Sequence, residues 1–265
     1  MNLEELTKEV ITIAHKAGNY LKEEQQRLRM EQVERKHAHD YVSYVDKESE
    51  KIVVSRLREI LPEAGFLTEE GTTGKRESEA VWWVIDPLDG TTNYIHGSQP
   101  FAVSIALRNT AEVLLGVVYE VSLDECFYAW KGGGAWLNES PIRVSAKPIS
   151  DALLGLELPY DSDMYRETGL YLIRHFYGYA SGIRMNGSAA VALCHVALGR
   201  WDGWMERGLG QWDFMAAALI IKEAGGQVCN FRGDDFFLDG DDIVASNGLI
   251  QQDLLKAIAS SPSVI

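Results

Sequence analysis

The feature that most constrains this chain is an apolar segment that runs into two closely spaced carboxylates. The strand-forming residues 82–85 lead directly into Asp86-Pro87-Leu88-Asp89-Gly90-Thr91-Thr92-Asn93. Pro87 lacks an N–H group and Gly90 permits a positive φ, so we expect the strand to stop at Asp86 and the chain to turn there. Asp-Pro and Asp-Gly are also common in ordinary turns. Two carboxylates beside the free N–H groups and hydroxyls that follow would nevertheless suit a metal ion with a phosphate.

The composition limits the class of protein and its partners. The 265 residues suit one large domain or two closely packed halves, and a net charge of −14 argues against nucleic acid or an anionic membrane as partner. Cys126, Cys194 and Cys229 are widely spaced in apolar surroundings, which indicates reduced core thiols. The N-terminal segment is amphipathic and charged, without the apolar core of a signal peptide, and no apolar run is long enough to span a bilayer. We therefore expect a cytoplasmic protein.

Hydrophobic periodicity and turn residues predict a mixed α/β chain. We expect helices over residues 3–21, 164–176, 188–198, 213–224 and 249–259, and a further helix that follows residues 41–46 and ends at Pro62. The expected strands are residues 65–70, 81–85, 101–108, 113–121, 125–130, 142–145, 153–158, 179–183, 203–206, 228–231 and 243–246. Residues 71–79 are predicted to form a loop. The pattern changes from antiparallel strands to alternating strands and helices, which divides the chain into sub-domains 1–145 and 146–265.

Three other patterns are better explained without a ligand. His37 and His39 have no cysteine or third histidine nearby, so they are interpreted as solvated loop residues. Lys131-Gly132-Gly133-Gly134 lacks the Lys-Ser/Thr of a phosphate-binding loop and is predicted to be a hairpin turn. The acidic residues between Asp234 and Asp242 miss the spacing of a calcium-binding loop.

Several separate motifs carry a resemblance to one family. Asp86 to Asn93 resembles the signature of the inositol monophosphatase family of Mg²⁺-dependent, lithium-sensitive phosphatases. Further stretches resemble the family in its order and spacing, namely residues 36–46, Thr68-Glu69-Glu70, 187–190, Glu206-Arg207-Gly208, Trp212-Asp213 and 223–226. The resemblance covers nearly the whole chain. It implies a layered α-β-α-β-α sandwich of the type shared with fructose-1,6-bisphosphatase, and a homodimer.

The resemblance also implies a set of site residues. Two or three Mg²⁺ ions would be held by Glu69, Asp86, the carbonyl of Leu88, Asp89 and Asp213, with Asp86 bridging two of them. Catalysis would fall to Glu69 and to Thr91 paired with Asp46, which would position and help deprotonate a water molecule. Substrate contacts would come from Gly90, Thr91, Gly187, Ser188, Ala189, Glu206, Asp213 and Lys36.

Elementary electrostatics is consistent with these expectations. Clustered carboxylates raise one another's pKa unless a cation joins them, and a set of oxygen ligands without Cys or His favours Mg²⁺ over Zn²⁺ or Cu²⁺. Phosphate monoesters hydrolyse so slowly in water that the full electrostatic help of a metal is needed. Each residue has a plain alternative, such as a helix N-cap for Asp213, worth about 1 kcal/mol, or a surface lysine for Lys36. The coincidence of several motifs favours the site.

Substrate and role stay open among alternatives. Inositol monophosphate is the leading hypothesis because Glu206 matches the family position that accepts hydrogen bonds from inositol hydroxyls. Fructose 1,6-bisphosphate, 3′-phosphoadenosine 5′-phosphate and NADP are the alternative substrates, and a non-catalytic regulatory relative is the third hypothesis. Two departures border the expected pocket: Gly210-Gln211 replaces a frequent proline, and His37 replaces a frequent glycine.

Overall fold

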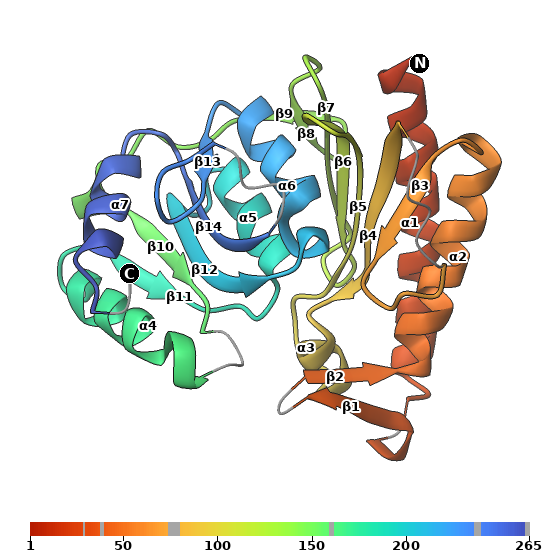
Figure 1. Cartoon of the computed structure of the whole chain (residues 1–265), viewed down its shortest axis with the longest axis horizontal. Coiled ribbons are helices and arrows are strands. Elements are labelled where there is room, and N and C mark those ends of the chain that lie inside the picture. Colours follow the sequence, from red (N-terminus) through yellow and green to blue (C-terminus); the bar gives the residue numbers. More distant parts are fainter. Residues whose placement is uncertain (29, 38–39, 74–79, 159–161, 236–239, 263–265) are drawn as a thin grey trace.

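The computed structural model describes residues 1–28, 30–37, 40–73, 80–158, 162–235 and 240–262. In these ranges the chain forms alternating layers of helices and sheets (Figure 1). The helices are α1 (Leu3–Gln25), α2 (Tyr44–Ile60), α3 (Thr91–Ile95), α4 (Ser162–Phe176), α5 (Ala189–Ala197), α6 (Gln211–Glu223) and α7 (Gln251–Ala259). Among the residues described, no helix combines the length and apolar character needed to cross a membrane. The layered α/β fold is the one that the resemblance implied.

The first sheet is covered by helices on both faces. Its strands, in the described residues, lie in the order β3 (Gly65–Thr68), β4 (Val81–Asp89), β5 (Ala102–Asn109), β6 (Val113–Glu120), β7 (Glu125–Trp130), β8 (Ala135–Leu137) and β9 (Ser140–Ile142). Only the β3–β4 pair is parallel within this sheet as described. Trp83 and Ile85 pack toward α1 and α2, whereas Val84 packs toward α5 and α6. Burial on both faces explains the unbroken apolar run before Asp86.

The second sheet lies on the far side of α5 and α6 (Figure 1). The described strands have the order β11 (Gly182–Arg184), β10 (Leu153–Leu156), β12 (Gly203–Leu209), β14 (Asp241–Ser246) and β13 (Gln227–Cys229). Strand β10 is parallel to both of its neighbours, and β14 is antiparallel to β12 and β13. Helices α4 and α7 cover the outer face, where Leu154, Met205 and Val244 share a core with Leu172 and Leu254.

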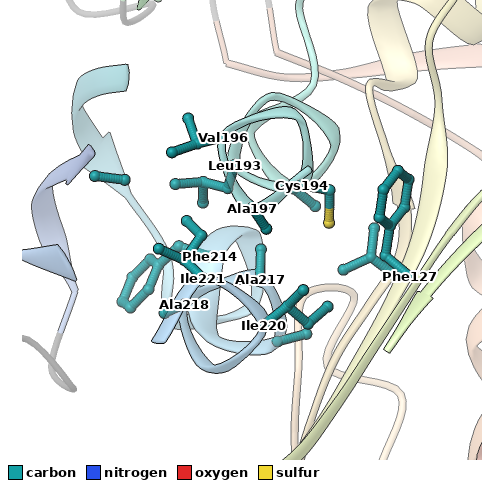
Figure 2. Packing of buried hydrophobic residues seen from close by; sticks show 14 of the residues in the cluster. Phe127, Leu193, Cys194, Val196, Ala197, Phe214, Ala217, Ala218, Ile220 and Ile221 are labelled. Atoms are coloured by element: carbon teal, nitrogen blue, oxygen red, sulfur yellow. The ribbon is translucent and has the colours of Figure 1, made fainter. Parts of the chain in front are cut away.

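Small side chains let α5 and α6 fill the space between the sheets. Figure 2 shows Cys194 and Ala197 of α5 close to Ala217 and Ile220 of α6, with Phe127 approaching from the first sheet. A Cβ atom on Gly116 of β6 would lie 2.4 Å from the carbonyl oxygen of Ala216, so glycine is needed where α6 meets the sheet. Helix α6 follows residue 146 but packs on the first sheet. The division of the chain into two sub-domains at residue 146 therefore stays a prediction.

Several expected elements differ in detail. The segment predicted as a polar break contains the hairpin β1 (Val33–His37) and β2 (Asp40–Ser43), so His37 lies in a strand and not in a loop, while His39 lies outside the described residues. The strand expected at 142–145 is replaced by the short pair β8 and β9, and β11 begins three residues later than predicted. These strands are three to five residues long. Such short segments carry little periodic signal.

Two further predictions, on the cysteines and on the glycine-rich turn, agree with the structure. Cys126, Cys194 and Cys229 are free and buried, as expected of reduced core thiols. The glycine-rich segment after Trp130 forms the turn between β7 and β8, and Glu223 accepts hydrogen bonds from the Gly132 and Gly134 amides at 2.8 and 2.9 Å. The predicted loop 71–79 is described only through residue 73, and the acidic run 234–242 is interrupted by residues outside the described part.

Candidate active site

One face of α2 supports three different segments of the site. Asp46, Ser49 and Glu50 are spaced to share that face, and all three are buried. Oδ1 of Asp46 accepts a hydrogen bond from Oγ1 of Thr91 at 3.1 Å, and Oγ of Ser49 donates to the carbonyl of Pro87 at 3.0 Å. The other oxygen of Asp46 accepts from the backbone N–H and the hydroxyl of Ser43, both at 2.8 Å, which completes a capping box at the start of α2.

Strand β4 does not end at Asp86, contrary to the prediction from the sequence. Asp86 pairs with Ser104 and Asp89 with Ala102, with a register shift between them. A proline is tolerated at such a bulge because the ladder is already interrupted there. The amide of Leu88 donates to Oδ1 of Asp86 at 2.9 Å. The bulge thus places both carboxylates and the Leu88 carbonyl at one end of the sheet.

The turn predicted at Gly90 is present and leads into α3. Gly90 has a φ of +88°, and a Cβ atom there would lie 2.9 Å from the carbonyl oxygen of Pro100. This position therefore favours glycine for both conformation and space. Thr91 is the first residue of α3, and its hydroxyl contacts the carbonyl of Leu88 at 3.0 Å as well as Asp46.

Asp89 joins the two halves of the molecule at the N-terminus of α5. Its Oδ2 accepts hydrogen bonds from the hydroxyl of Ser188 and from the amide of Ala190, the latter at 2.8 Å. Ser188 is also the N-cap of α5, accepting from the amide of Val191 at 3.3 Å. A carboxylate is favourable at this position because free N–H groups and the helix dipole both attract negative charge.

Burial and mutual repulsion act on the carboxylates that line the site. Burial raises the pKa of Asp86 well above its ordinary value, and the carboxylates of Glu69, Asp89 and Asp213 raise it further. Burial also raises the pKa of Asp89 to about 6, although the hydrogen bonds from Ser188 and Ala190 oppose the shift. The cavity thus gathers several carboxylates, and the negative charge of each one destabilises the charged form of the others.

The carboxylates are near one another but do not form a finished ligand set. Within the part of the chain described, no three His, Cys, Asp or Glu side chains are arranged as a preassembled metal site. One oxygen each of Asp86, Asp89 and Asp213 accepts a backbone hydrogen bond, which for Asp213 comes from Gly210 at 2.7 Å. The donor set still fits a hard divalent cation, because every group offered is a carboxylate or carbonyl oxygen and because the cluster carries excess negative charge.

The opposite side of the pocket carries two more carboxylates, Glu157 and Glu206, which are half-buried. Glu157 accepts hydrogen bonds from the amides of Asn186 and Gly187 at 2.6 and 3.1 Å. Asn93 donates to the carbonyls of Pro100 and Asn186 at 2.8 and 2.7 Å, so segment 186–187 is held from both sides. Burial raises the pKa of Glu206 well above its ordinary value, and the negative charges of Glu157, Asp213 and Asp89 raise it further.

Most of the predicted site residues line one cavity of about 330 Å³. These residues are Glu69, Asp86, Leu88, Asp89, Gly90, Thr91, Gly187, Ser188, Ala189, Glu206 and Asp213. Asp46 lies behind Thr91, and residue 36 is in β1 but its side chain lies outside the described part. Among the described residues, no ion pair joins Glu206 to Arg184 or Arg207. Instead, Arg207 lies 4.0 Å from Asp241 and 3.8 Å from Asp242, and Arg184 contacts its neighbour's carbonyl.

Sequence reasoning missed several residues of the site. The cavity is also lined by Thr92, Asn93, Glu157, Leu158, Gly208 and Leu209, and Glu50 lies behind it on α2. Two of these carried a usable signal. Glu157 follows the apolar residues 153–156 as Asp86 follows the apolar residues 82–85, and Glu50 stands one helical turn after Asp46.

Known proteins are similar in sequence to most of this chain. The sequence profile of the inositol monophosphatase family matches residues 2–263. The chain is 39% identical to an inositol-1-monophosphatase of Mesorhizobium japonicum over 250 residues, 94% of each chain. It is 40% identical to the Nus factor SuhB of Pseudomonas aeruginosa over 250 residues, 92% of each chain.

A solved structure is also similar over nearly its full length. The crystal structure of the extragenic suppressor protein suhB from Bartonella henselae superposes with a TM-score of 0.90 at 36% identity, covering 97% of this chain and 99% of that one. Fold, site motifs and sequence therefore point the same way: the chain belongs to the inositol monophosphatase family.

Proposed function

We propose that this protein is a Mg²⁺-dependent phosphatase that hydrolyses myo-inositol monophosphate to myo-inositol and phosphate. The observation that carries the proposal is the grouping of Glu69, Asp86, Asp89 and Asp213 around one cavity, with the pKa of Asp86 raised by burial and by the other three. Side chains from three separate segments would not be gathered in this way at a cost in stability without a cation to join them.

Glu69, Asp86, the Leu88 carbonyl, Asp89 and Asp213 would hold two or three Mg²⁺ ions. When bound, such ions supply Lewis-acid stabilisation of charge on the phosphoryl and leaving oxygens and lower the pKa of water. The Leu88 carbonyl contacts the Thr91 hydroxyl but retains a second lone pair for a ligand bond. Asp89 keeps one oxygen that is not engaged by α5, since Ser188 and Ala190 both contact Oδ2.

Thr91 and Asp46 are the proton-handling pair. Oγ1 of Thr91 would accept a proton from the attacking water while passing its own proton to Oδ1 of Asp46, 3.1 Å away. Asp46 is fixed for this task by the capping box with Ser43. Burial raises its pKa, with the hydrogen bonds from Ser43 and Thr91 opposing the shift, so the carboxylate is a stronger base than an exposed aspartate.

The amides of Gly90 and Thr91 would orient the phosphate oxygens at the start of α3. They follow the bulge directly, so the phosphate and the carboxylate cluster would be held by consecutive residues. Backbone donors fixed by a turn need no reorganisation when charge develops on the oxygens.

The other side of the pocket supports a neutral, hydroxyl-bearing leaving group with a single phosphate. Glu157 and Glu206 line this side, and no Lys or Arg is among the described residues that line the cavity. A second phosphate, as in fructose 1,6-bisphosphate or 3′-phosphoadenosine 5′-phosphate, would meet no cationic partner among the described lining residues and would face two carboxylates. Ring hydroxyls can instead donate to Glu206, and Ser188 and Ala189 would line the ring.

The experiment that tests this proposal is a phosphate-release assay on a substrate panel with and without Mg²⁺. We expect turnover of inositol 1-phosphate that depends on Mg²⁺ and is lowered by Li⁺, with much slower turnover of the two bisphosphates and of NADP. Faster turnover of a bisphosphate or of NADP would overturn the inositol assignment. Absence of turnover on every substrate would overturn the phosphatase.

A regulatory role is the second candidate, because the 40% identical relative from Pseudomonas aeruginosa is named a Nus factor. The presence of every expected metal ligand at the cavity favours catalysis over a purely regulatory relative. A stable partner captured without metal, together with absence of turnover on every substrate, would favour the regulatory role.

We further infer a cytoplasmic homodimer. The free, buried cysteines suit a reducing compartment. Leu158, Leu170, Tyr177, Tyr179 and Met185 are exposed on and around α4 and β11 and would provide an apolar contact between copies. Light scattering at micromolar concentration should give twice the monomer mass of 29.6 kDa, and a monomer would contradict the inference.

A further inference from the structure

Glu50 is a buried carboxylate with no role in the chemistry proposed above. It lies on α2 with 0% of its surface exposed, and it does not line the cavity. Nevertheless it accepts four hydrogen bonds, all from the segment that contains Glu69. A buried carboxylate is costly unless its oxygens are satisfied, so this arrangement needs a reason beyond packing.

The four donors surround Glu69. Oε1 of Glu50 accepts from the hydroxyl of Thr68 at 3.0 Å, from the amide of Thr72 at 2.8 Å and from the hydroxyl of Thr72. Oε2 accepts from the amide of Glu70 at 2.8 Å. Residues on both sides of Glu69 are thus tied to a single carboxylate on a helix.

The backbone of Glu69 itself is held by the neighbouring strand. Its amide donates to the carbonyl of Ile85 at 3.2 Å, which extends the parallel pairing of β3 and β4 by one residue. The pairing ends there, as Thr68 is the last residue of β3. Beyond this point, hydrogen bonds from Glu70 and Thr72 tie the chain to Glu50.

We propose that Glu50 is a positioning residue for the metal site, which holds Glu69 toward Asp86 and so sets the affinity for Mg²⁺. The proposal rests on the proposed function only in that Glu69 is taken as a ligand. It places on one turn of α2 the supports for two parts of the site, since Asp46 contacts Thr91 and Glu50 contacts the segment around Glu69. Ligands held by a fixed neighbouring group bind a metal more tightly than mobile ones.

The sharpest variant is Glu50→Gln, because it keeps the shape but not the number of acceptors. A glutamine can keep its oxygen toward the three donors at Oε1 only by turning its NH₂ group toward the Glu70 amide, which is also a donor. The residue next to Glu69 therefore loses its hydrogen bond while the core packing is retained. Glu48→Gln is the matched control, since Glu48 is exposed on the same helix and pairs with Lys51.

We expect Glu50→Gln to weaken Mg²⁺ binding by about 10- to 100-fold in calorimetry without substrate. Hydrogen exchange of the Glu70 amide should accelerate in the same variant, and Glu48→Gln should match the wild type in both measurements. In a background of Glu69→Gln, the further change to Glu50→Gln should have little effect on Mg²⁺ affinity, because the two residues act through one ligand.

Three results would overturn the proposal. One is unchanged Mg²⁺ affinity in Glu50→Gln, even if its melting temperature falls, since that combination indicates a merely structural role. Another is unchanged exchange at Glu70. The last is an additive effect in the Glu69→Gln background. Failure of the phosphatase assignment is distinguishable, because a wild-type protein that binds Mg²⁺ but releases no phosphate from any substrate leaves these measurements valid.

Discussion

The two sides of the pocket are built in different ways. On one side, Asp86, Leu88 and Asp89 come from a single bulged strand, and α2 supports them through Ser49 and supports Thr91 through Asp46. On the other side, Glu206 lies in β12 of the second sheet and Glu157 directly follows β10 of the same sheet. From this contrast we propose a division of labour: the strand-and-helix side would determine whether a phosphate is hydrolysed, and the second-sheet side would determine which phosphate is accepted.

Glu206 differs from Asp46 and Asp89 in how its charge is balanced. Asp46 and Asp89 accept hydrogen bonds from neighbouring donors on fixed elements. Glu206 has no ion pair among the described residues, and the pKa of this carboxyl is raised by burial and by three other acids. A group of this kind is suited to accept hydrogen bonds from a substrate that arrives with hydroxyl groups.

The largest expected effect comes from breaking the strand side at Asp86. Asp86→Asn keeps the shape of the side chain but removes the charge that would join the metal ions, and with it several kcal/mol of transition-state stabilisation. At about 1.4 kcal/mol for each tenfold, we expect kcat to fall by about 10⁴-fold. Phosphate release at saturating Mg²⁺ measures this. A fall of less than tenfold would show that Asp86 is not a metal ligand.

The next effect tests the proton-handling pair. Thr91→Ala removes the hydroxyl between water and Asp46, and we expect kcat to fall by about 10²- to 10⁴-fold with little change in KM. The kcat of Asp46→Asn should fall by a similar factor, and the kcat of the double variant should be no lower than that of either single variant. Thr91→Ser is the matched control and should retain most of the activity. Equal activity of Thr91→Ala and Thr91→Ser would exclude a role of the Thr91 hydroxyl in proton transfer.

A smaller effect separates the two sides directly. Glu206→Gln loses a charged acceptor for the substrate hydroxyls, worth about 1.5–3 kcal/mol. We expect kcat/KM for inositol 1-phosphate to fall by about 10- to 100-fold, whereas kcat/KM for phenyl phosphate, which has no ring hydroxyls, stays within about twofold of wild type. An equal loss of kcat/KM on both substrates would assign Glu206 to the hydrolysis step and contradict the proposed division of labour between the two sides of the pocket.

The smallest effect concerns stability and pH in the absence of metal. Burial raises the pKa of Asp89 from 3.8 to about 6, so between these values the folded protein binds more protons than the unfolded chain. The free energy of unfolding therefore decreases as the pH rises through this window, by about 3 kcal/mol for this one group. Thermal unfolding with EDTA should show the decrease in the wild type and a smaller one in Asp89→Asn. An increase attributable to Asp89 would contradict the sign.

Much of the fold could be predicted because long amphipathic helices and doubly buried strands leave a clear pattern. The spacing of Leu3 to Leu21 defines α1, and the apolar run before Asp86 defines β4. The hairpin of β1 and β2 and the pair of β8 and β9 were missed or shifted, because strands of three to five residues carry too few positions to show a period. The bulge at Pro87 was missed because it depends on the pairing of β4 with β5, which the sequence around Pro87 does not reveal.

The site divides along the same line between local and long-range information. Asp86, Asp89 and Gly90 were found because they stand together in one motif. Glu50, Asn93 and Glu157 were missed because their partners are distant in sequence or their role is to hold backbone groups. Ser188 was predicted only as a substrate contact, yet its hydroxyl at the start of α5 donates to Asp89 of the first sheet. The spacing of residues within one segment could not reveal this contact.

The central claim is that the carboxylate cluster at the end of β4 is a binding site for divalent cations. Calorimetric titration of Mg²⁺ into the wild-type protein and into Asp86→Asn at pH 7.5 tests it most directly. We predict saturable binding of at least one Mg²⁺ per chain in the wild type and at least 100-fold weaker binding in the variant. Absence of Mg²⁺ binding in the wild type, or equal binding in both proteins, would contradict the claim.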